Sequence, residues 1–304
     1  MDYYKILNEK EYHHGLQYKF GLNVDPKEFN PSGDCSPGGI YFSREDIFAF
    51  IHYGPWIRKI TLPKDAQVYE NPGGPKKWKA DRIILGKKEK ITAKVIKRLI
   101  DEGADPNVDN SWILVWAAKC KYLEIVKLII PYINSKIAFN QALNTAAKNG
   151  QLKIVKLLIP HSEIDDSEAL TYSIMNGHFK ISKLLIPYSN LKANNSEALR
   201  FAAEVGSLEI VKLLIPHSNP KSLNSHALSL AAKNGHLEIV KLLLPYSNPK
   251  SDSSKALLRA AKNGHLEIVK LLIPHSEINN YVFDCCKIHC DDPEIFDLIK
   301  ANKK

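Results

Sequence analysis

The sequence contains no long hydrophobic run, which argues against a membrane-spanning helix. Such a helix needs roughly 18 or more consecutive apolar residues, and here a lysine interrupts each long apolar stretch, as Lys156 does within residues 154–158. The segment Met1–Lys5 also lacks the basic region and apolar core of a secretory signal. We therefore expect a cytosolic protein without a membrane partner.

Cysteine is scarce and is not arranged as a disulfide framework. Cys35 and Cys120 are isolated, and Cys285, Cys286 and Cys290 lie close together near residue 290. An odd number of cysteines without regular spacing is not typical of a disulfide-stabilised secreted domain. The pattern predicts free thiols in a reducing compartment.

The signature motifs of several large enzyme classes are missing too. The sequence has no P-loop, no glycine fingerprint of a dinucleotide-binding fold and no nucleophile elbow around a serine. We therefore expect no cofactor and no enzymatic activity.

Positive charge is present, but most of it lies in one segment. The chain of 304 residues has a net charge of +9, and residues 76–98 hold ten basic and two acidic residues, which gives this segment a charge of +8. Trp78 is the one aromatic residue in the segment, so stacking platforms for single-stranded nucleic acid are missing. We expect a solvated strand edge and helix face here rather than a nucleic-acid site.

An internal repeat dominates the remainder. The segment Ala227–Pro245 recurs almost unchanged as Ala256–Pro274, and weaker copies precede it. The six closing prolines, at positions 131, 160, 187, 216, 245 and 274, are separated by 29, 27, 29, 29 and 29 residues. A fixed period of this length is typical of a solenoid built from stacked helical hairpins.

Each copy predicts two short antiparallel helices. The first is expected to begin at a serine N-cap (Ser167, Ser196, Ser225 and Ser254) and to end at a glycine, such as Gly235. The second has the pattern Leu-Glu-Ile-Val-Lys-Leu-Leu, with Leu237, Val240 and Leu244 on one stripe. The closing proline disfavours helical geometry in the residue before it and should end the second helix.

The motif Ala-Ala-Lys-Asn-Gly-His-Leu-Glu-Ile-Val-Lys-Leu-Leu resembles the ankyrin repeat, and Gly103–Asn107 resembles that family's inter-repeat loop. The period of 29 instead of 33 indicates that the β-hairpin finger is shortened. We expect a mostly α fold: an ankyrin-like α-solenoid over residues 91–304, preceded by a small α+β domain over residues 1–90. The solenoid would comprise a half repeat at 91–102, six repeats at about 103–278 and a terminal cap at 279–304.

Residues 1–90 have a different composition and hold 14 of the 27 aromatic residues. Strands are predicted at Gly39–Ser43, Ile57–Leu62, Gln67–Tyr69 and Arg82–Leu85, with a helix at Arg44–His52.

Together with the array, the segments His13–Tyr18, Pro37–Phe42 and Trp78–Gly86 resemble ankyrin-repeat proteins of giant amoeba-infecting viruses of the mimivirus group. This resemblance implies a host protein as partner, and a location in the host cytoplasm or in the virion. It assigns no activity to the N-terminal domain, and we expect a monomer.

Two chemical alternatives stay open. On a helix, Cys286 and Cys290 would share a face, with His289 near them and Cys285 adjacent in sequence. These side chains are potential metal ligands; the alternative is that the cysteines are small apolar residues packed on the preceding repeat.

In the N-terminal domain, His14-Gly15 and Gly39–Ser43 resemble the mono-ADP-ribosyltransferase pattern, with Glu70 as its acidic residue. A third alternative is a ubiquitin-ligase adaptor, but the sequence has no F-box-like segment near the C-terminal end.

The histidines that follow glycine (His178, His236 and His265) are too widely spaced to share an ion, and the ankyrin resemblance implies that each bonds to loop backbone.

The function predicted from the sequence is a protein–protein interaction scaffold that uses the concave face of the repeats. The ankyrin resemblance places contacts at the end of each first helix and at the residue before its Ala-Leu pair, and departures from the internal consensus add four more. The candidate residues are Gln141, Lys148, Glu168, Tyr172, Met175, Glu197, Arg200, Phe201, Glu204, Val205, His226, Lys233, Lys255 and Lys262. The segment Tyr172–Val205 is the expected hot spot.

Overall fold

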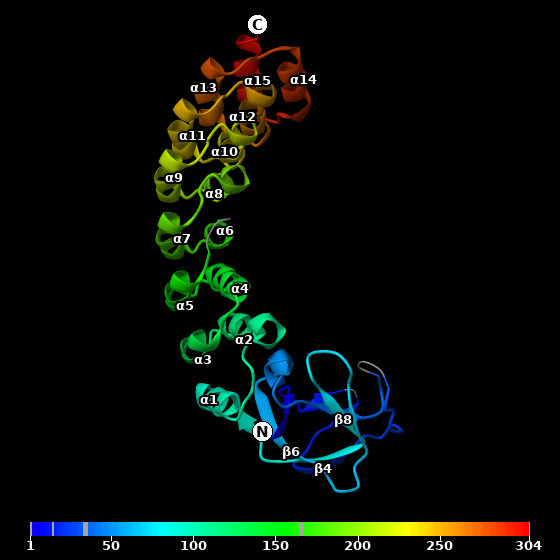
Figure 1. Ribbon diagram of the computed structural model, residues 1–304. Helices are drawn as coiled ribbons and strands as arrows, with labels where there is room; N and C mark the ends of the chain where they lie inside the picture. The colour runs from blue at the N-terminus through cyan, green and yellow to red at the C-terminus, as the bar shows by residue number, and fades with distance from the viewer. Residues whose placement is uncertain (1, 14, 33–35, 164–166, 304) are drawn as a thin grey trace. The chain divides into compact units, whose positions relative to one another are not determined.

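The computed structural model describes residues 2–13, 15–32, 36–163 and 167–303. Strands precede residue 91 and helices follow it (Figure 1). The chain divides into two compact units: unit 1 is Met1–Ala146 with Lys153–Ser162, and unit 2 is Ala147–Leu152 with Glu163–Lys304.

The strands form three antiparallel sheets in unit 1. One sheet has the order β1-β6-β9-β4, and β10 also pairs with β6; a second sheet is β2-β3, and the third has the order β5-β8-β7. The strands are β1 Tyr3–Leu7, β2 Tyr12–His13, β3 Leu16–Gln17, β4 Gly21–Val24, β5 Ile40–Phe42, β6 Trp56–Thr61, β7 Val68–Glu70, β8 Trp78–Ala80, β9 Arg82–Leu85 and β10 Glu89–Lys90.

The four predicted strands are confirmed as β5, β6, β7 and β9, but the predicted helix at 44–52 is instead the 3-10 helix η1, Ile47–Tyr53. Strand β1 was missed for a physical reason. Four of its five residues are buried, so side chains on both of its faces are covered; at its edges it pairs with β6, and Tyr4 bridges Ser43. A strand buried on both faces shows no alternation of apolar and polar residues.

The core of the strand region joins the sheets. Leu7, Tyr18, Ile40, Phe42, Ile60, Ala80, Ile83 and Leu85 form one buried cluster. Unit 1 also includes the helices that directly follow the strands in the sequence. Two hydrogen bonds connect residues 102–105 to the strand region: the Tyr4 hydroxyl donates to Glu102 at 2.7 Å, and the Asp105 amide donates to the Glu45 carbonyl at 2.8 Å. The change from strands to helices falls near residue 90, and a domain boundary there stays a prediction.

The helices alternate between a first and a second helix in each repeat. They are α1 Ala93–Asp101, α2 Val108–Lys119, α3 Leu123–Ile129, α4 Lys136–Lys148, α5 Leu152–Leu158, α6 Glu168–Met175, α7 Phe179–Leu185, α8 Ala193–Glu204, α9 Leu208–Leu214, α10 Ser222–Lys233, α11 Leu237–Leu243, α12 Ser251–Lys262, α13 Leu266–Leu272, α14 Asn280–His289 and α15 Pro293–Ala301.

Within unit 2, first helices pack on first helices and second helices on second helices. The pairs α6–α8, α8–α10 and α10–α12 form one row, and α7–α9, α9–α11 and α11–α13 form the other (Figure 1). Ala231 and Ala232 are fully buried, so their small side chains let neighbouring helices approach closely. The predicted stripe on α11 is partly wrong: Val240 is buried, but its buried neighbours are Ile239 and Leu243, and Leu237 and Leu244 are half-buried.

The predicted serine N-caps are right in position but wrong in geometry. Ser167 directly precedes α6 but makes no capping hydrogen bond, and the right-handed part of α10 and α12 begins after Ser225 and Ser254, because residues 223–225 and 252–254 have left-handed angles. Ser196, Ser225 and Ser254 have positive φ angles of 56°, 59° and 55°. An N-cap residue has an extended backbone instead. The serine hydroxyls accept hydrogen bonds from the next repeat: from the amide of Asn219 at 2.8 Å, of Asn248 at 2.8 Å and of Glu277 at 2.9 Å, respectively.

The closing prolines act differently from the prediction as well. Ile130, which precedes Pro131, keeps right-handed helical angles (φ −44°, ψ −47°), and the α-helix tightens into the 3-10 turn η2, Ile130–Tyr132. The same turn recurs as η3 Ile159–His161, η4 Ile186–Tyr188, η5 Ile215–His217, η6 Leu244–Tyr246 and η7 Ile273–His275. Proline is tolerated there because the first turn of a helix needs no donor at that position.

Candidate functional site

The ends of the first helices carry the first set of candidate residues. Lys148, Met175, Glu204, Lys233 and Lys262 are the last residues of α4, α6, α8, α10 and α12, respectively. None of the fourteen candidates is buried. Gln141 belongs to unit 1, and the other thirteen belong to unit 2. We call the thirteen residues of unit 2 the first-helix face.

Apolar and aromatic side chains lie in the middle of this face. Met175 is 47% exposed and Val205 is 40% exposed. Tyr172 is half-buried, and the Lys148 ammonium lies 5.8 Å from the centre of its ring. These residues can supply the apolar anchors that protein-binding hot spots use.

Basic side chains come together further along the same face. Burial lowers the pKa of His226, and the positive charges of Arg259, Arg200 and Lys255 lower it further. We call these four residues the basic group; they come from α8, α10 and α12. Arg259 donates to the Ser229 hydroxyl at 3.0 Å, and Lys255 pairs with Asp252 on its own helix. Arg259 was not a candidate from the sequence because a single arginine in a repeat carries no distinctive signal; in the structure it is half-buried.

The remaining candidates lie around these two groups. Glu197 is 3.9 Å from Arg200 on α8, where Phe201 is half-buried, and Glu168 is exposed at the start of α6. The structure therefore brings Arg200, His226 and Lys255 together, whereas Gln141 lies in the other unit.

The repeated histidines bond to the backbone of the preceding repeat. The Nε2–H groups of His178, His236 and His265 donate to the carbonyls of Lys148, Glu204 and Lys233 at 3.1, 3.0 and 2.9 Å. The expected backbone hydrogen bond is present, but its acceptor is the end of a first helix, not a loop. These bonds satisfy carbonyls that a helix leaves without a partner at its end.

The cysteine cluster lines a cavity of about 390 Å³ together with Asp252, Lys255 and Arg259. Cys286 is 2% exposed, and burial raises the pKa of its thiol to about 12. The Cys290 thiol donates to the carbonyls of Ala261 and Asp292, both at 3.5 Å. Over the described ranges, no group of three or more His, Cys, Asp or Glu side chains is arranged to hold a metal ion.

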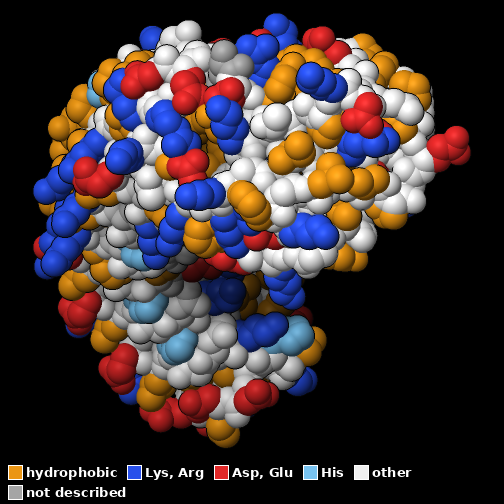
Figure 2. Space-filling view, turned by 90° about the horizontal axis from the view of Figure 1, so that it is seen from below, with side chains coloured by type: hydrophobic (Ala, Val, Ile, Leu, Met, Phe, Trp, Pro, Cys, Tyr) orange, Lys and Arg blue, Asp and Glu red, His pale blue; other side chains and the backbone are white. Residues whose placement is uncertain are grey.

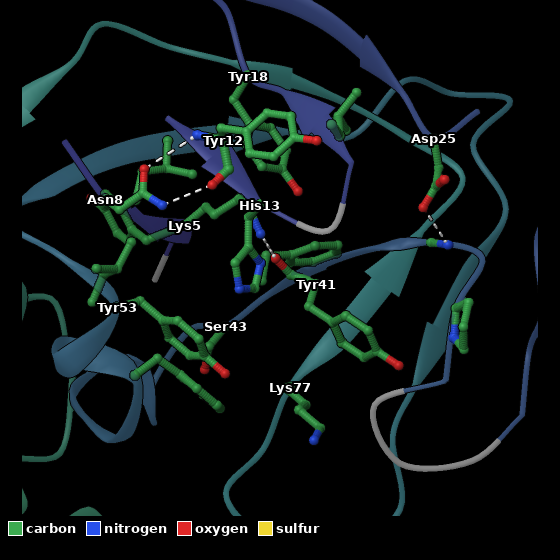
Figure 3. Close-up of a pocket in the computed structure, with 18 of the residues that line it drawn as sticks. Lys5, Asn8, Tyr12, His13, Tyr18, Asp25, Tyr41, Ser43, Tyr53 and Lys77 are labelled. Atoms are coloured by element: carbon green, nitrogen blue, oxygen red, sulfur yellow. Dashed lines mark hydrogen bonds between the residues drawn. The ribbon is translucent and has the colours of Figure 1, made fainter. Parts of the chain in front are cut away.

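A second cavity, which we call the head pocket, lies within unit 1. It has a volume of about 340 Å³ and is lined by residues of β1, β2, β5 and η1 and of the loops between them, with Lys5, His13, Tyr18, Tyr41 and Tyr53 around its centre (Figure 3). The sequence analysis missed it, although a lone lysine within the apolar strand Tyr3–Leu7 was a usable signal.

The mono-ADP-ribosyltransferase pattern is only partly represented at this pocket. Tyr41 lines it, but Glu70 lies on β7 and is not among the lining residues. His14 lies outside the described residues, and Gly15 forms part of the turn between β2 and β3 instead of a strand.

Much of the positive charge of residues 76–98 is already neutralised or buried. Lys79 is fully buried, Lys88 is 3.3 Å from Glu11, and Arg98 is 2.8 Å from Glu89. Arg82 pairs with both Asp65 and Asp81. On the face shown in Figure 2, Lys and Arg side chains lie among acidic and hydrophobic ones.

Among the described residues, no helix has both the length and the apolar character needed to cross a bilayer.

Comparison with known proteins gives one consistent relationship. A family model described as ankyrin repeats (3 copies) matches residues 87–167, 143–224 and 199–284, which together cover more than half of the chain. The chain is 36% identical over 134 residues to a putative ankyrin repeat protein of Acanthamoeba polyphaga mimivirus, covering 42% of this chain and 66% of that protein.

Two further mimivirus proteins are similar. A second putative ankyrin repeat protein is 34% identical over 140 residues, covering 41% of this chain and 46% of that protein. An uncharacterized protein is 39% identical over 129 residues, covering 41% of this chain and 94% of that protein. The chain thus spans less than two thirds of two of these relatives. The period, the paired helices and these matches agree: the chain belongs to the ankyrin-repeat family.

Proposed function

We propose that this chain is a non-enzymatic viral scaffold whose first-helix face binds a protein of the infected cell. Ankyrin repeats generally mediate protein–protein interaction, and the relatives of this chain are viral. The observation that supports this proposal best is the combination of exposed Met175 and Val205 with the basic group on one row of helices.

The chemistry of this face indicates the kind of partner segment. Apolar side chains of the partner would cover Met175 and Val205, and its carboxylates would pair with Arg200, Lys255 and Arg259. Pairing with a carboxylate would also favour the charged form of His226, whose pKa is lowered in the free chain. The proposed partner segment is therefore acidic with apolar anchors, and its binding should weaken with salt.

The test compares substitutions on the two rows of helices. In a pull-down of the partner from host cells, we expect Lys255→Glu combined with Arg259→Glu to weaken binding by about tenfold or more, and Met175→Ser to do the same. The charge reversals Glu204→Lys and Lys233→Glu should also change the amount of partner that the chain binds in this pull-down.

The matched control is Lys212→Glu, which reverses an exposed lysine on the second helix α9. This control should bind as the unchanged chain does. If the substitutions on both rows weaken binding equally, or if those on the first-helix face have no effect, the proposed function is wrong.

A further inference from the structure

The head pocket encloses a buried amine that the protein-binding function does not use. Lys5 lies on β1, where strand alternation places its side chain on the same face as Leu7 of the buried cluster. The residue is only 7% exposed, and its burial lowers the pKa of the amine to about 7. Figure 3 shows the Lys5 side chain extending among the rings that line the pocket.

The hydrogen bonds of this amine are incomplete. Its Nζ donates to the Tyr41 carbonyl at 2.7 Å and lies 4.8 Å from the centre of the Tyr18 ring. Within residues 2–13, 15–32, 36–163 and 167–303, no other acceptor and no carboxylate pairs with it. An ammonium group has three donors, so two hydrogens have no protein acceptor in this part of the chain. A buried cation without a counter-ion is unfavourable, and an anionic ligand would correct this.

The walls of the pocket are aromatic. Tyr12, Tyr18, Tyr41 and Tyr53 line it together with Phe42 and Phe50, and the His13 ring lies 5.3 Å from that of Tyr53 in an edge-on arrangement. Flat apolar faces of this kind favour a flat aromatic ligand, because stacked and edge-on ring pairs are both stabilising.

Asp25, the acidic residue among the described lining residues of the pocket, does not compete for the amine. The Asp25 carboxylate accepts the Gly39 amide at 2.8 Å and the Lys27 amide at 2.9 Å, which holds it on the loop backbone. Lys27 and Lys77 also line the pocket, so the lining residues that the structure describes carry more positive than negative charge. The volume of about 340 Å³ lies in the range of small-molecule sites.

We infer that the head pocket binds a small planar aromatic ligand with one negatively charged group, the charged group on Lys5 Nζ and the ring between the tyrosine side chains. This site is separate from the first-helix face, so the inference stands or falls independently of the proposed protein partner.

Three probes separate the contribution of the ring from that of the charge. We expect 2-naphthoate to bind the full chain about tenfold or more tightly than 2-naphthamide, which lacks the charge, and than decahydro-2-naphthoate, which lacks the flat ring. Lys5→Met should abolish the preference for 2-naphthoate over 2-naphthamide. The control is Lys59→Met, which removes an exposed lysine of β6 that pairs with Asp2 and does not line the pocket. This variant should keep the preference for 2-naphthoate over 2-naphthamide.

A second measurement needs no substitution. Because the anion pairs with the protonated amine, affinity for 2-naphthoate should fall by about tenfold or more as the pH rises from about 6 to about 9, with proton uptake on binding near pH 8. Calorimetry in two buffers of different ionisation enthalpy measures this uptake, even if Lys5→Met does not fold. Equal affinities for 2-naphthoate and 2-naphthamide, no binding of any probe, or binding without proton uptake would overturn the inference.

Discussion

At the scale of single residues, glycine and histidine act as pairs across consecutive repeats. Gly150, Gly206 and Gly235 lie beneath the rings of His178, His236 and His265, and a Cβ atom at each glycine would approach the ring to within 2.5–2.8 Å. Gly177 has no such neighbour, because the position that corresponds to His236 in the next repeat is Ser207. Gly206 therefore needs glycine both for its left-handed backbone and because the His236 ring occupies the space of a Cβ atom, whereas Gly177 needs it for its left-handed backbone alone.

This difference predicts the outcome of a matched pair of substitutions. Gly177 and Gly206 have similar left-handed φ angles of 72° and 81°, so alanine should cost about 1 kcal/mol at either position. Gly206→Ala also displaces the His236 ring and its hydrogen bond to Glu204, which should add about 1–3 kcal/mol.

Urea denaturation of the two variants measures the difference in the free energy of unfolding. Equal losses of stability in Gly206→Ala and Gly177→Ala would show that the His236 ring does not constrain this position.

At the scale of elements, serine hydroxyls connect the first helices α8, α10 and α12 to the loop of the next repeat. Ser225 accepts the Asn248 amide at 2.8 Å, and Ser196 and Ser254 make the equivalent bonds. Ser167 is fully buried, yet its hydroxyl has no partner among the described residues. In these three repeats the serine hydroxyl thus supplies an acceptor for a backbone amide of the following loop.

The serine bonds lead to a second matched prediction. Ser225→Ala leaves the Asn248 amide without its acceptor and should destabilise the chain by about 1–2 kcal/mol. Ser167→Ala removes a buried hydroxyl without a described partner and should be neutral or slightly stabilising. Thermal unfolding of both variants compares them, and an equal decrease in their melting temperatures would contradict this role of Ser225.

The elements also show where sequence reasoning was sufficient and where it was not. The helical hairpins were predictable because they depend on local patterns: the closing proline recurs six times, and the glycine stop and the buried alanine pair recur five times each. The role of Ser225 was not, since its acceptor function depends on a residue 23 positions later and on left-handed angles that serine rarely adopts. Strand β1 was missed because burial on both faces removes the alternation that identifies a strand.

For the candidate sites the same distinction applies. The ends of the first helices were correctly located, because helix ends follow from the repeat pattern. The approach of Arg200, His226 and Arg259 was not predictable, because it joins three helices. For the head pocket, the lone lysine within an apolar strand was the only signal in the sequence, and it could not show that Lys5 and Tyr41 lie together, because they come from different strands.

At the scale of the whole molecule, the two parts of the chain offer different kinds of surface. The first-helix face has exposed apolar residues and a basic group, as a protein partner requires. The head pocket is small, aromatic and contains one buried amine. The proposed protein contact therefore depends on the repeats, and the substitutions that disrupt it should leave the head pocket unchanged.

The most direct measurement of this claim is site-specific photocrosslinking of the full chain in infected host cells. A photoreactive residue replaces either Met175 or Lys233 on the first-helix face, or Lys212 or Lys241 on the second helices α9 and α11. We predict that the first two positions crosslink to the same host protein and that the last two do not. Crosslinks to that protein from Lys212 and Lys241, with none from Met175 and Lys233, would contradict the account.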